Sequence, residues 1–309
     1  MLLTDNLLSL PFCRNDHAGC APLSGIMAGT PHNMNETNTT CETIMSSETA
    51  RKVERVKDAL CEQGSILIAF SGGVDSSVLA KLAKLAEPNG VTVLAATASS
   101  ELLGDHGLAH ARKVADEIGI EHHVFKFEIL RDSEFTENTR DRCYHCKKHL
   151  IRELQKIAAE NRIETIADGT NITDLAGDRP GYAAIRQADV FTPFVDFTLE
   201  KSEIRRIARY FGLSVADTPS ESCFATRIPS GTRITIPQLS RIEKAESVLH
   251  AHGLHGVRVR TCEADHDQLA HIEIQPGDIK RFIAVQENVT RAFGRIGFDR
   301  VMLHQAPDA

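Results

Sequence analysis

The chain has 309 residues, of which 42% are hydrophobic and 25% are charged, the proportions of an ordinary globular protein long enough for two domains. Its formal net charge of −7 argues against a general nucleic-acid binder, because proteins that follow phosphate backbones usually carry a basic excess. No apolar run approaches the roughly 18–20 residues that a membrane span requires, so no membrane partner is expected.

Residues 1–49 mix Asn, Thr, Ser, Pro and Gly with three cysteines and show no sustained helical or strand period. The short apolar start lacks the basic flank and the long apolar core of a signal peptide. We interpret this segment as a disordered extension, or as the product of an upstream start codon assigned in error. Met45 would be a natural start, because a capping residue and helical spacing follow it.

The run Ile66–Ser77, ILIAFSGGVDSS, is the most informative part of the chain. An apolar strand ends in paired glycines, which allow a sharp turn and a close approach to a ligand, and a helix begins at once. Serine hydroxyls and the free N–H groups at a helix N-terminus bind anions, and Asp75 can hold Mg²⁺ beside them. We therefore predict a nucleotide phosphate site formed by Ser71, Gly72, Gly73, Val74, Asp75, Ser76 and Ser77. A Gly-Ser turn without a ligand is the plainer alternative.

Helical and strand patterns alternate from about residue 50 onward. Helices are expected at 53–63, 76–86, 108–118 and 146–161, and strands at 65–70, 90–98, 121–129 and 164–168. This alternation predicts an α/β domain over residues 50–217, built on a doubly wound parallel sheet. Ligands of such sheets bind at the carboxyl ends of the strands, so the loops after Phe70, Ala98 and Asp168 are expected to lie together.

Cys143 and Cys146 form a C-x-x-C pair at a predicted helix start, and Cys223 stands alone further along. Phosphate chemistry without an export signal indicates the cytoplasm, where a disulfide framework is not expected. Four interpretations of the cysteines remain open: a redox pair, a zinc site, a three-cysteine iron–sulfur cluster, and incidental core thiols.

A second candidate nucleotide loop, ADGTNITDLAGDRPGYAA, covers residues 167–184. Gly169 and Thr170 follow a strand, Asp178 adds a carboxylate, and Arg179 can pair with phosphate as a bidentate fork. Polar Gly/Pro/Asp clusters are also ordinary surface loops, so the loop supports a nucleotide site only together with SGGVDSS.

A second unit is expected over residues 218–309. Helical patterns cover 238–252 and 279–293, and strand patterns cover 256–262, 269–274 and 300–304. This order predicts a smaller α+β domain. Arg258 and Arg260 are two residues apart in a predicted strand, so their side chains point to the same face. Such a pair is about as consistent with a phosphate clamp as with a solvent-exposed surface.

The SGGVDSS loop resembles that of the ATP pyrophosphatase (PP-loop) family, whose members use ATP to adenylylate a second substrate and release pyrophosphate. Together with DGTN–DRPG, VRVR and the segment containing Pro219, Cys223, Arg227, Pro229 and Gly231, it is similar to the LarE family over about residues 51–303. Those enzymes convert a carboxylate of pyridinium-3,5-biscarboxylate mononucleotide into a thiocarboxylate. The resemblance implies a cytoplasmic homo-oligomer that takes a small nucleotide substrate, ATP, Mg²⁺, and sulfide or another sulfur donor.

The resemblance also implies roles for single residues. Cys223 matches the family's sulfur-donor position, and Cys143 and Cys146 match a branch in which the three hold a [4Fe-4S] cluster. Arg258, Arg260, Glu246 and Glu273 match positions around the substrate phosphate and the sulfur-transfer pocket. The chain departs from the family at Lys280-Arg281, where an acidic residue is expected.

Three other functions remain open: a PP-loop tRNA thiolase, an ammonia-dependent synthetase of NAD or GMP type, and a non-catalytic nucleotide-binding metal sensor. The acidic charge disfavours the first. A synthetase would have no use for the three cysteines Cys143, Cys146 and Cys223. A sensor would bind ATP without releasing pyrophosphate, which an assay can detect.

Overall fold

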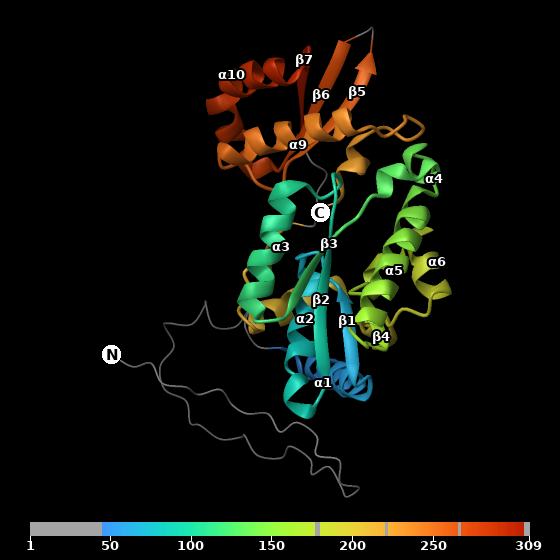
Figure 1. Ribbon diagram of the computed structural model, residues 1–309. Coiled ribbons are helices and arrows are strands. Elements are labelled where there is room, and N and C mark those ends of the chain that lie inside the picture. Colours follow the sequence, from blue (N-terminus) through green and yellow to red (C-terminus); the bar gives the residue numbers. More distant parts are fainter. Residues whose placement is uncertain (1–44, 177–179, 220–221, 265–266, 306–309) are drawn as a thin grey trace, which may run out of the picture.

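The computed structural model describes residues 45–176, 180–219, 222–264 and 267–305 (Figure 1). The predicted N-terminal extension therefore lies almost entirely outside the described residues. Its last residues already belong to the first helix, which begins at Ser47, because the Ser46 hydroxyl accepts the Thr49 N–H at 3.1 Å and caps the helix.

The core of the larger unit is a parallel sheet with the strand order β3-β2-β1-β4. Its strands are β1 (Ser65–Ala69), β2 (Thr92–Ser99), β3 (His122–Lys126) and β4 (Thr165–Ala167). The central strand is apolar throughout because it is covered on both faces: Ile66 and Ile68 face one hydrophobic core and Leu67 faces another.

Helices cover both faces of this sheet, which makes it doubly wound, as predicted. One face packs on α1 (Ser47–Glu62), α2 (Val74–Lys84), α3 (Gly104–Ile118) and α8 (Lys201–Tyr210). The other face packs on α5 (Arg142–Glu160). The short helices of this unit are α4 (Ser133–Thr136), α6 (Pro180–Gln187) and α7 (Pro193–Asp196), with 3₁₀ turns η1 (Glu87–Asn89), η2 (Ile129–Arg131) and η3 (Ile172–Ala176).

The second, smaller sheet has the order β5-β6-β7, with β5 antiparallel to β6 and β6 parallel to β7. Its elements are η4 (Phe224–Arg227), α9 (Ile236–Ala251), β5 (Arg258–Ala264), β6 (Asp267–Ile274), η5 (Pro276–Asp278), α10 (Ile279–Ile296) and β7 (Arg300–Gln305). One face packs on α9 and α10 around Leu249, Ile272 and Phe293. The chain is thus α/β with a second, mixed sheet.

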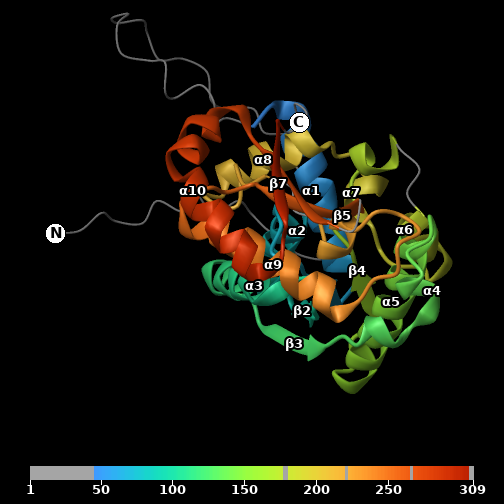
Figure 2. The same cartoon turned by 90° about the horizontal axis from the view of Figure 1, so that it is seen from above.

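The two units that contain these sheets meet where α3 lies next to α9 (Figures 1 and 2). They are also joined at η4, where the Phe224 N–H donates to the Leu102 carbonyl at 3.0 Å. The Asp105 N–H at the start of α3 donates to Glu243 Oε1 in α9 at 2.8 Å. A hydrophobic cluster containing Phe127, Phe135 and Ile228 joins the loop after β3 to α4 and to the segment after η4. Within the described residues, none of the helices is both long enough and apolar enough to span a membrane.

Candidate functional site

Two glycines and two serine hydroxyls shape the loop after β1. Gly72 has a φ of +76°, and a Cβ on it would lie 2.8 Å from the Cα of Ala111 in α3, so no larger residue fits without displacing the backbone. Gly73 is the N-cap of α2, and its N–H donates to Ser71 Oγ at 3.3 Å. The hydroxyls of Ser71 and Ser76 lie 3.1 Å apart. These contacts hold the loop around the N-terminus of α2.

The first turn of α2 has the properties of an anion site. The first N–H groups of a helix have no partner inside it, and the helix dipole is positive at that end. The Ser77 hydroxyl is buried and has no hydrogen-bond partner among the described residues. An unpaired buried hydroxyl is costly unless a ligand or water satisfies it. The arrangement is therefore suited to phosphate oxygens.

The loop after β4 packs directly on this helix N-terminus. A Cβ on Gly169 would lie 2.9 Å from the backbone nitrogen of Ser76 and 3.0 Å from the carbonyl carbon of Asp75, so only glycine permits the approach. Of the three loops predicted to lie together, those after β1 and β4 are thus in contact. Asp178 and Arg179, also predicted to bind the nucleotide, lie outside the described residues.

Asp75 lies between an ammonium group and a second carboxylate. Lys201 Nζ forms an ion pair with Asp75 Oδ2, and Asn171 Nδ2 donates to Asp75 Oδ1 at 3.1 Å and to Asp174 Oδ2 at 2.8 Å. Burial raises the pKa of the Asp75 carboxyl, Lys201 opposes this, and Asp174 adds to it. Neighbouring carboxylates are the oxygen donors that Mg²⁺ prefers, so this donor set fits the ion expected beside a bound phosphate.

Lys147 and Asp168 form a buried pair that connects α5 to the end of β4. Lys147 Nζ donates to Asp168 Oδ2 at 3.0 Å, and Asp168 Oδ1 accepts the Thr170 N–H at 2.9 Å. Burial opposes the charge on both partners. The ammonium nevertheless holds the pKa of Asp168 below its ordinary value, and the carboxylate holds the pKa of Lys147 above its own. The pair links the turn carrying the C-x-x-C motif to the nucleotide loops.

The three predicted cysteines come from two elements. Helix α5 begins at Arg142, four residues earlier than predicted, so Cys143 and Cys146 both lie at its N-terminal end. Cys223 is the N-cap of η4. The N–H of Phe224 donates to the carbonyl of Leu102 at 3.0 Å, which anchors η4 to the segment following β2. Cys223 therefore lies at the carboxyl edge of the parallel sheet.

The three thiols influence one another electrostatically. Burial, and then Cys223, raise the pKa of Cys146 to about 12, with a further contribution from Cys143. Desolvation also raises the pKa of Cys223, although this side chain is solvent-accessible; Arg142 opposes the shift and Cys143 adds to it.

No group of three His, Cys, Asp or Glu side chains in the described part of the chain is close enough to hold a metal ion as it stands. The three thiols thus share one neighbourhood without forming a preassembled site. Thiolates are the ligands that iron–sulfur clusters require, so the donor set fits such a cluster in its chemistry.

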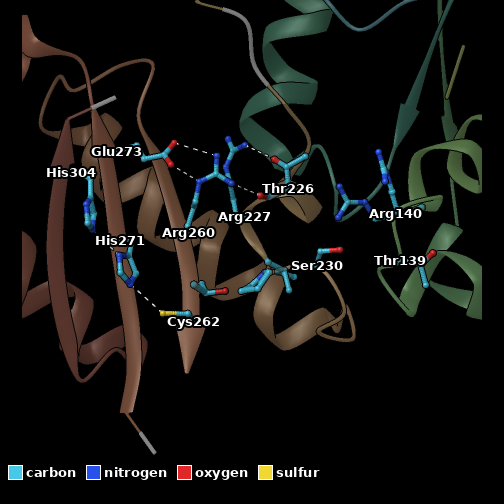
Figure 3. Close-up of a pocket in the computed structure, with 14 residues that line it drawn as sticks. Thr139, Arg140, Thr226, Arg227, Ser230, Arg260, Cys262, His271, Glu273 and His304 are labelled. Atoms are coloured by element: carbon cyan, nitrogen blue, oxygen red, sulfur yellow. Dashed lines mark hydrogen bonds and ion pairs between the residues drawn. The ribbon is translucent and has the colours of Figure 1, made fainter. Parts of the chain in front are cut away.

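A pocket of about 660 Å³ opens between η4 and the small sheet (Figure 3). Arg260 and Glu273 lie on its wall and form an ion pair, in which Arg260 Nη2 and Glu273 Oε2 are 3.4 Å apart. Arg260 Nη1 also donates to the Thr226 carbonyl at 2.7 Å, which joins β5 to η4. Arg258 lies further away, with its Nη1 3.9 Å from Glu273 Oε2. Arg258, Arg260 and Glu273 are thus brought together. The strand alternation predicted a shared face for the two arginines, and the family resemblance implied that Glu273 lies near them.

Glu246, the remaining predicted site residue, is buried behind this wall. Its Oε1 accepts from Arg227 Nε at 2.8 Å and from the Val259 N–H at 2.9 Å, and both charged side chains are under 10% exposed. This ion pair connects η4, α9 and β5. Its position indicates that Glu246 orients Arg227 and β5 and does not itself face the pocket.

Several side chains near these candidate sites were not predicted from the sequence to take part in them. Those near the nucleotide loops are Lys147, Asn171 and Lys201, and those on the pocket wall are Arg140, Cys262, His271 and His304. The pocket residues did carry one usable signal, since Cys262 follows Arg260 and His271 precedes Glu273 at strand spacing.

The family model described as asparagine synthase matches residues 53–155. A protein of uncharacterized function from Synechocystis sp. is 34% identical over 75% of this chain and 84% of its own length. The pyridinium-3,5-bisthiocarboxylic acid mononucleotide synthase of Lactiplantibacillus plantarum is 30% identical over 82% of this chain and 90% of its own length. A tRNA-specific 2-thiouridylase of Rickettsia bellii is 29% identical over 62% of each chain.

Proposed function

The chain belongs to the LarE family of PP-loop, ATP-utilising enzymes, and from this premise we propose that it is an ATP-dependent sulfurtransferase. Its substrate is pyridinium-3,5-biscarboxylate mononucleotide. It adenylylates one carboxylate of this substrate and replaces an oxygen with sulfur, releasing pyrophosphate and AMP.

One structural observation carries the proposal: a continuous set of contacts joins the thiols to the nucleotide loops. Lys147 follows Cys146 in α5 and pairs with Asp168, and Gly169 then packs on the first turn of α2. Cys223 reaches the same sheet edge through η4. These contacts support the proposal that an activating site and a nucleophile act at one sheet edge, as activation followed by displacement requires.

The nucleotide loops supply the activating step. A carboxylate is a poor electrophile, and adenylylation gives its oxygen a good leaving group. The N–H groups and hydroxyls at the start of α2 bind the phosphates of ATP, and Lys201 neutralises charge beside Asp75. Asp75 and Asp174 would hold Mg²⁺, which offsets the negative charge of the departing pyrophosphate.

The thiols and the pocket serve the second step. We assign Cys223 as the residue at which sulfur is delivered, either from its own thiol or through a cluster that it helps to hold. Arg258 and Arg260 form the clamp for the substrate phosphate, and Glu273 orients them. Glu246 is a positioning residue, because it acts through Arg227 and β5. Cys143, Cys146 and Cys223 would hold a [4Fe-4S] cluster, which would leave one iron without a protein ligand and supply inorganic sulfide.

The proposal is tested with the pyridinium substrate, ATP, Mg²⁺ and sulfide, by measuring pyrophosphate release and by mass spectrometry of the thiocarboxylate. Pyrophosphate and the thiocarboxylate should both form only when the pyridinium substrate is present. Asp75→Asn should lower pyrophosphate release, while the matched variant Cys61→Ala, at a free cysteine of α1, should leave it unchanged. Pyrophosphate release without the pyridinium compound but with tRNA would favour a thiolase. No pyrophosphate with either would favour a binding protein.

The cluster has its own test. Anaerobically purified protein should absorb in the visible range and contain about four irons and acid-labile sulfide, and Cys143→Ala should lose them. A colourless protein with zinc or without metal would refute the cluster and leave Cys223 as a sacrificial sulfur donor.

A further inference from the structure

The small sheet has one face in the hydrophobic core and the other on the wall of the pocket. Val259, Ile272 and Ile274 pack against α9 and α10. Successive side chains of a strand point to opposite faces, so the residues alternating with these belong to the pocket face. That face carries Arg260, Cys262, His271, Glu273 and His304 (Figure 3). The thiol and the two imidazoles have no part in the function proposed above.

Cys262, His271 and His304 form a hydrogen-bonded row across three strands. Cys262 Sγ lies 3.1 Å from His271 Nε2, and His271 Nδ1 lies 2.8 Å from His304 Nε2. Both contacts are diagonal between neighbouring strands, since His271 is paired directly with Arg260 in β5 and with Met302 in β7. The two rings are inclined by only 20°, with centroids 4.9 Å apart, so that one ring nitrogen points toward the other.

The row has the geometry of a proton relay and not of a metal site. His271 uses both ring nitrogens within it, one toward sulfur and one toward His304, so the three side chains do not converge on one point. A consistent assignment has the Cys262 thiol donating to Nε2 and the Nδ1–H of His271 donating to His304. Burial, and then His304, lower the pKa of His271, which favours the neutral imidazole that can accept a proton. A thiol, a base and a residue that orients the base make an activated nucleophile.

We propose that Cys262 is a nucleophilic thiol of the pocket, distinct from Cys223, that His271 activates and His304 helps to orient, and that it accepts a sulfane sulfur from a small anionic hydropersulfide. The inference rests on the proposed function, because each thiocarboxylate formed consumes one sulfur atom that must be resupplied. Cys262 is a catalytic residue in this step, and His304 is a positioning residue.

The transfer balances without an added oxidant or reductant. His271 Nε2 takes the thiol proton, and Cys262 Sγ attacks the terminal sulfur of the hydropersulfide. The new Sγ–S bond forms as the S–S bond of the donor breaks, and its electron pair leaves on the donor thiolate. That thiolate takes the proton back from His271. One S–S bond replaces another, and the products are a thiol and the Cys262 hydropersulfide.

The size and charge of the pocket favour a small anionic donor. Its volume of about 660 Å³ is that of a site for a small molecule. Arg140 and Arg142 line it from the α4–α5 side, and Arg260 lines it from the sheet, so guanidinium groups line the same pocket as the thiol. Carboxylates are the natural partners of such guanidinium groups.

The first experiment uses the full-length reduced protein and glutathione persulfide. After a timed quench with an alkylating agent, mass spectrometry measures how fast each cysteine peptide gains one sulfur atom. Cys262 should gain sulfur at least about tenfold faster than Cys61, and His271→Gln should lower the Cys262 rate about tenfold or more without changing Cys61, because general-base catalysis is lost. Equal rates at the two cysteines, or an unchanged rate in His271→Gln, would overturn the inference.

A second variant separates positioning from a loss of structure. Among the described residues, the charged or titratable groups that face His271 and His304 include Arg258, Arg260, Cys262 and Glu273 on the sheet, and Arg140, Arg142 and Arg227 on the elements across the pocket. Since His304 helps to lower the pKa of His271, His304→Gln should move the acid limb of the Cys262 pH–rate profile to higher pH. A uniform fall in rate with an unmoved profile would contradict the role of His304. Pyrophosphate release from ATP is measured separately, so its absence would refute the proposed function and not the reactivity of Cys262.

Discussion

The nucleotide loop and the thiol pocket are built in different ways. The first consists mainly of backbone: two glycines, the N-terminus of α2 and hydroxyls from residues adjacent in the chain. The second consists of side chains that η4, β5, β6 and β7 bring together from distant positions. A backbone site tolerates almost no change of residue at its glycines, whereas a side-chain site depends on the ion pairs that orient its walls.

The nucleotide loop and the pocket are also suited to different chemical tasks. The nucleotide loop is suited to binding phosphate, and phosphate binding by N–H groups needs little beyond correct backbone geometry. The pocket carries a thiol, imidazoles and guanidinium groups, whose chemistry depends on their protonation and partners. Changes in the first site should therefore affect activation by ATP, and changes in the second should affect sulfur transfer.

Cys223→Ala should separate the two steps most strongly. Thiocarboxylate formation should fall by at least about 1,000-fold, because no other group at the N-cap of η4 can replace the sulfur nucleophile. Pyrophosphate release in a single turnover should remain, since the nucleotide loop is intact. Equal loss of both products would show that the two regions do not act separately and that Cys223 supports ATP binding.

Glu246→Gln should destabilise the folded protein at the pocket wall. The Arg227 guanidinium would remain buried without its counter-charge, which should lower the free energy of unfolding by about 3 kcal/mol in chemical denaturation. Asp217→Asn is the matched control, because it removes the exposed pair with Arg209 and should cost less than about 1 kcal/mol. Similar costs for both variants would mean that the buried pair does not organise the pocket wall.

Gly72→Ala should displace the backbone of the nucleotide loop, because the added Cβ would collide with Ala111. Gly72 and Gly90 both have positive φ, but only at Gly72 would a Cβ meet backbone, at Ala111. Gly90→Ala should cost about 1 kcal/mol of unfolding free energy for the left-handed conformation, and Gly72→Ala about 2–3 kcal/mol because overpacking is added. ATP-dependent pyrophosphate release should fall only in Gly72→Ala. Equal activity in the two variants would contradict the close packing of the loop.

The smallest expected effect is the pH dependence of stability contributed by the Lys147–Asp168 pair, which joins α5 to the nucleotide loops. The Asp168 carboxyl has a folded-state pKa below its ordinary 3.8, so its contribution to stability is present above that value and is lost as pH falls through the folded pKa. The difference in unfolding free energy between the wild type and Asp168→Asn should therefore shrink between about pH 5 and about pH 2. A difference that does not change with pH would show that Asp168 is not ionised in the folded protein.

The sequence by itself determined the parallel sheet and the nucleotide loop. Strand and helix periodicity depend on neighbouring residues, and SGGVDSS contains its own turn, cap and anion site within seven positions. Helix starts were less well predicted: α5 begins at Arg142, four residues before the expected position.

Only the tertiary structure decided which distant side chains meet. The diagonal contacts of Cys262, His271 and His304 depend on the pairing of β5 with β6 and of β6 with β7. Likewise, Glu246 is an unremarkable helical residue in sequence, and its buried pair with Arg227 exists because η4 packs against α9. Strand register and helix packing are set by the burial of whole faces, which no local pattern specifies for a single polar residue.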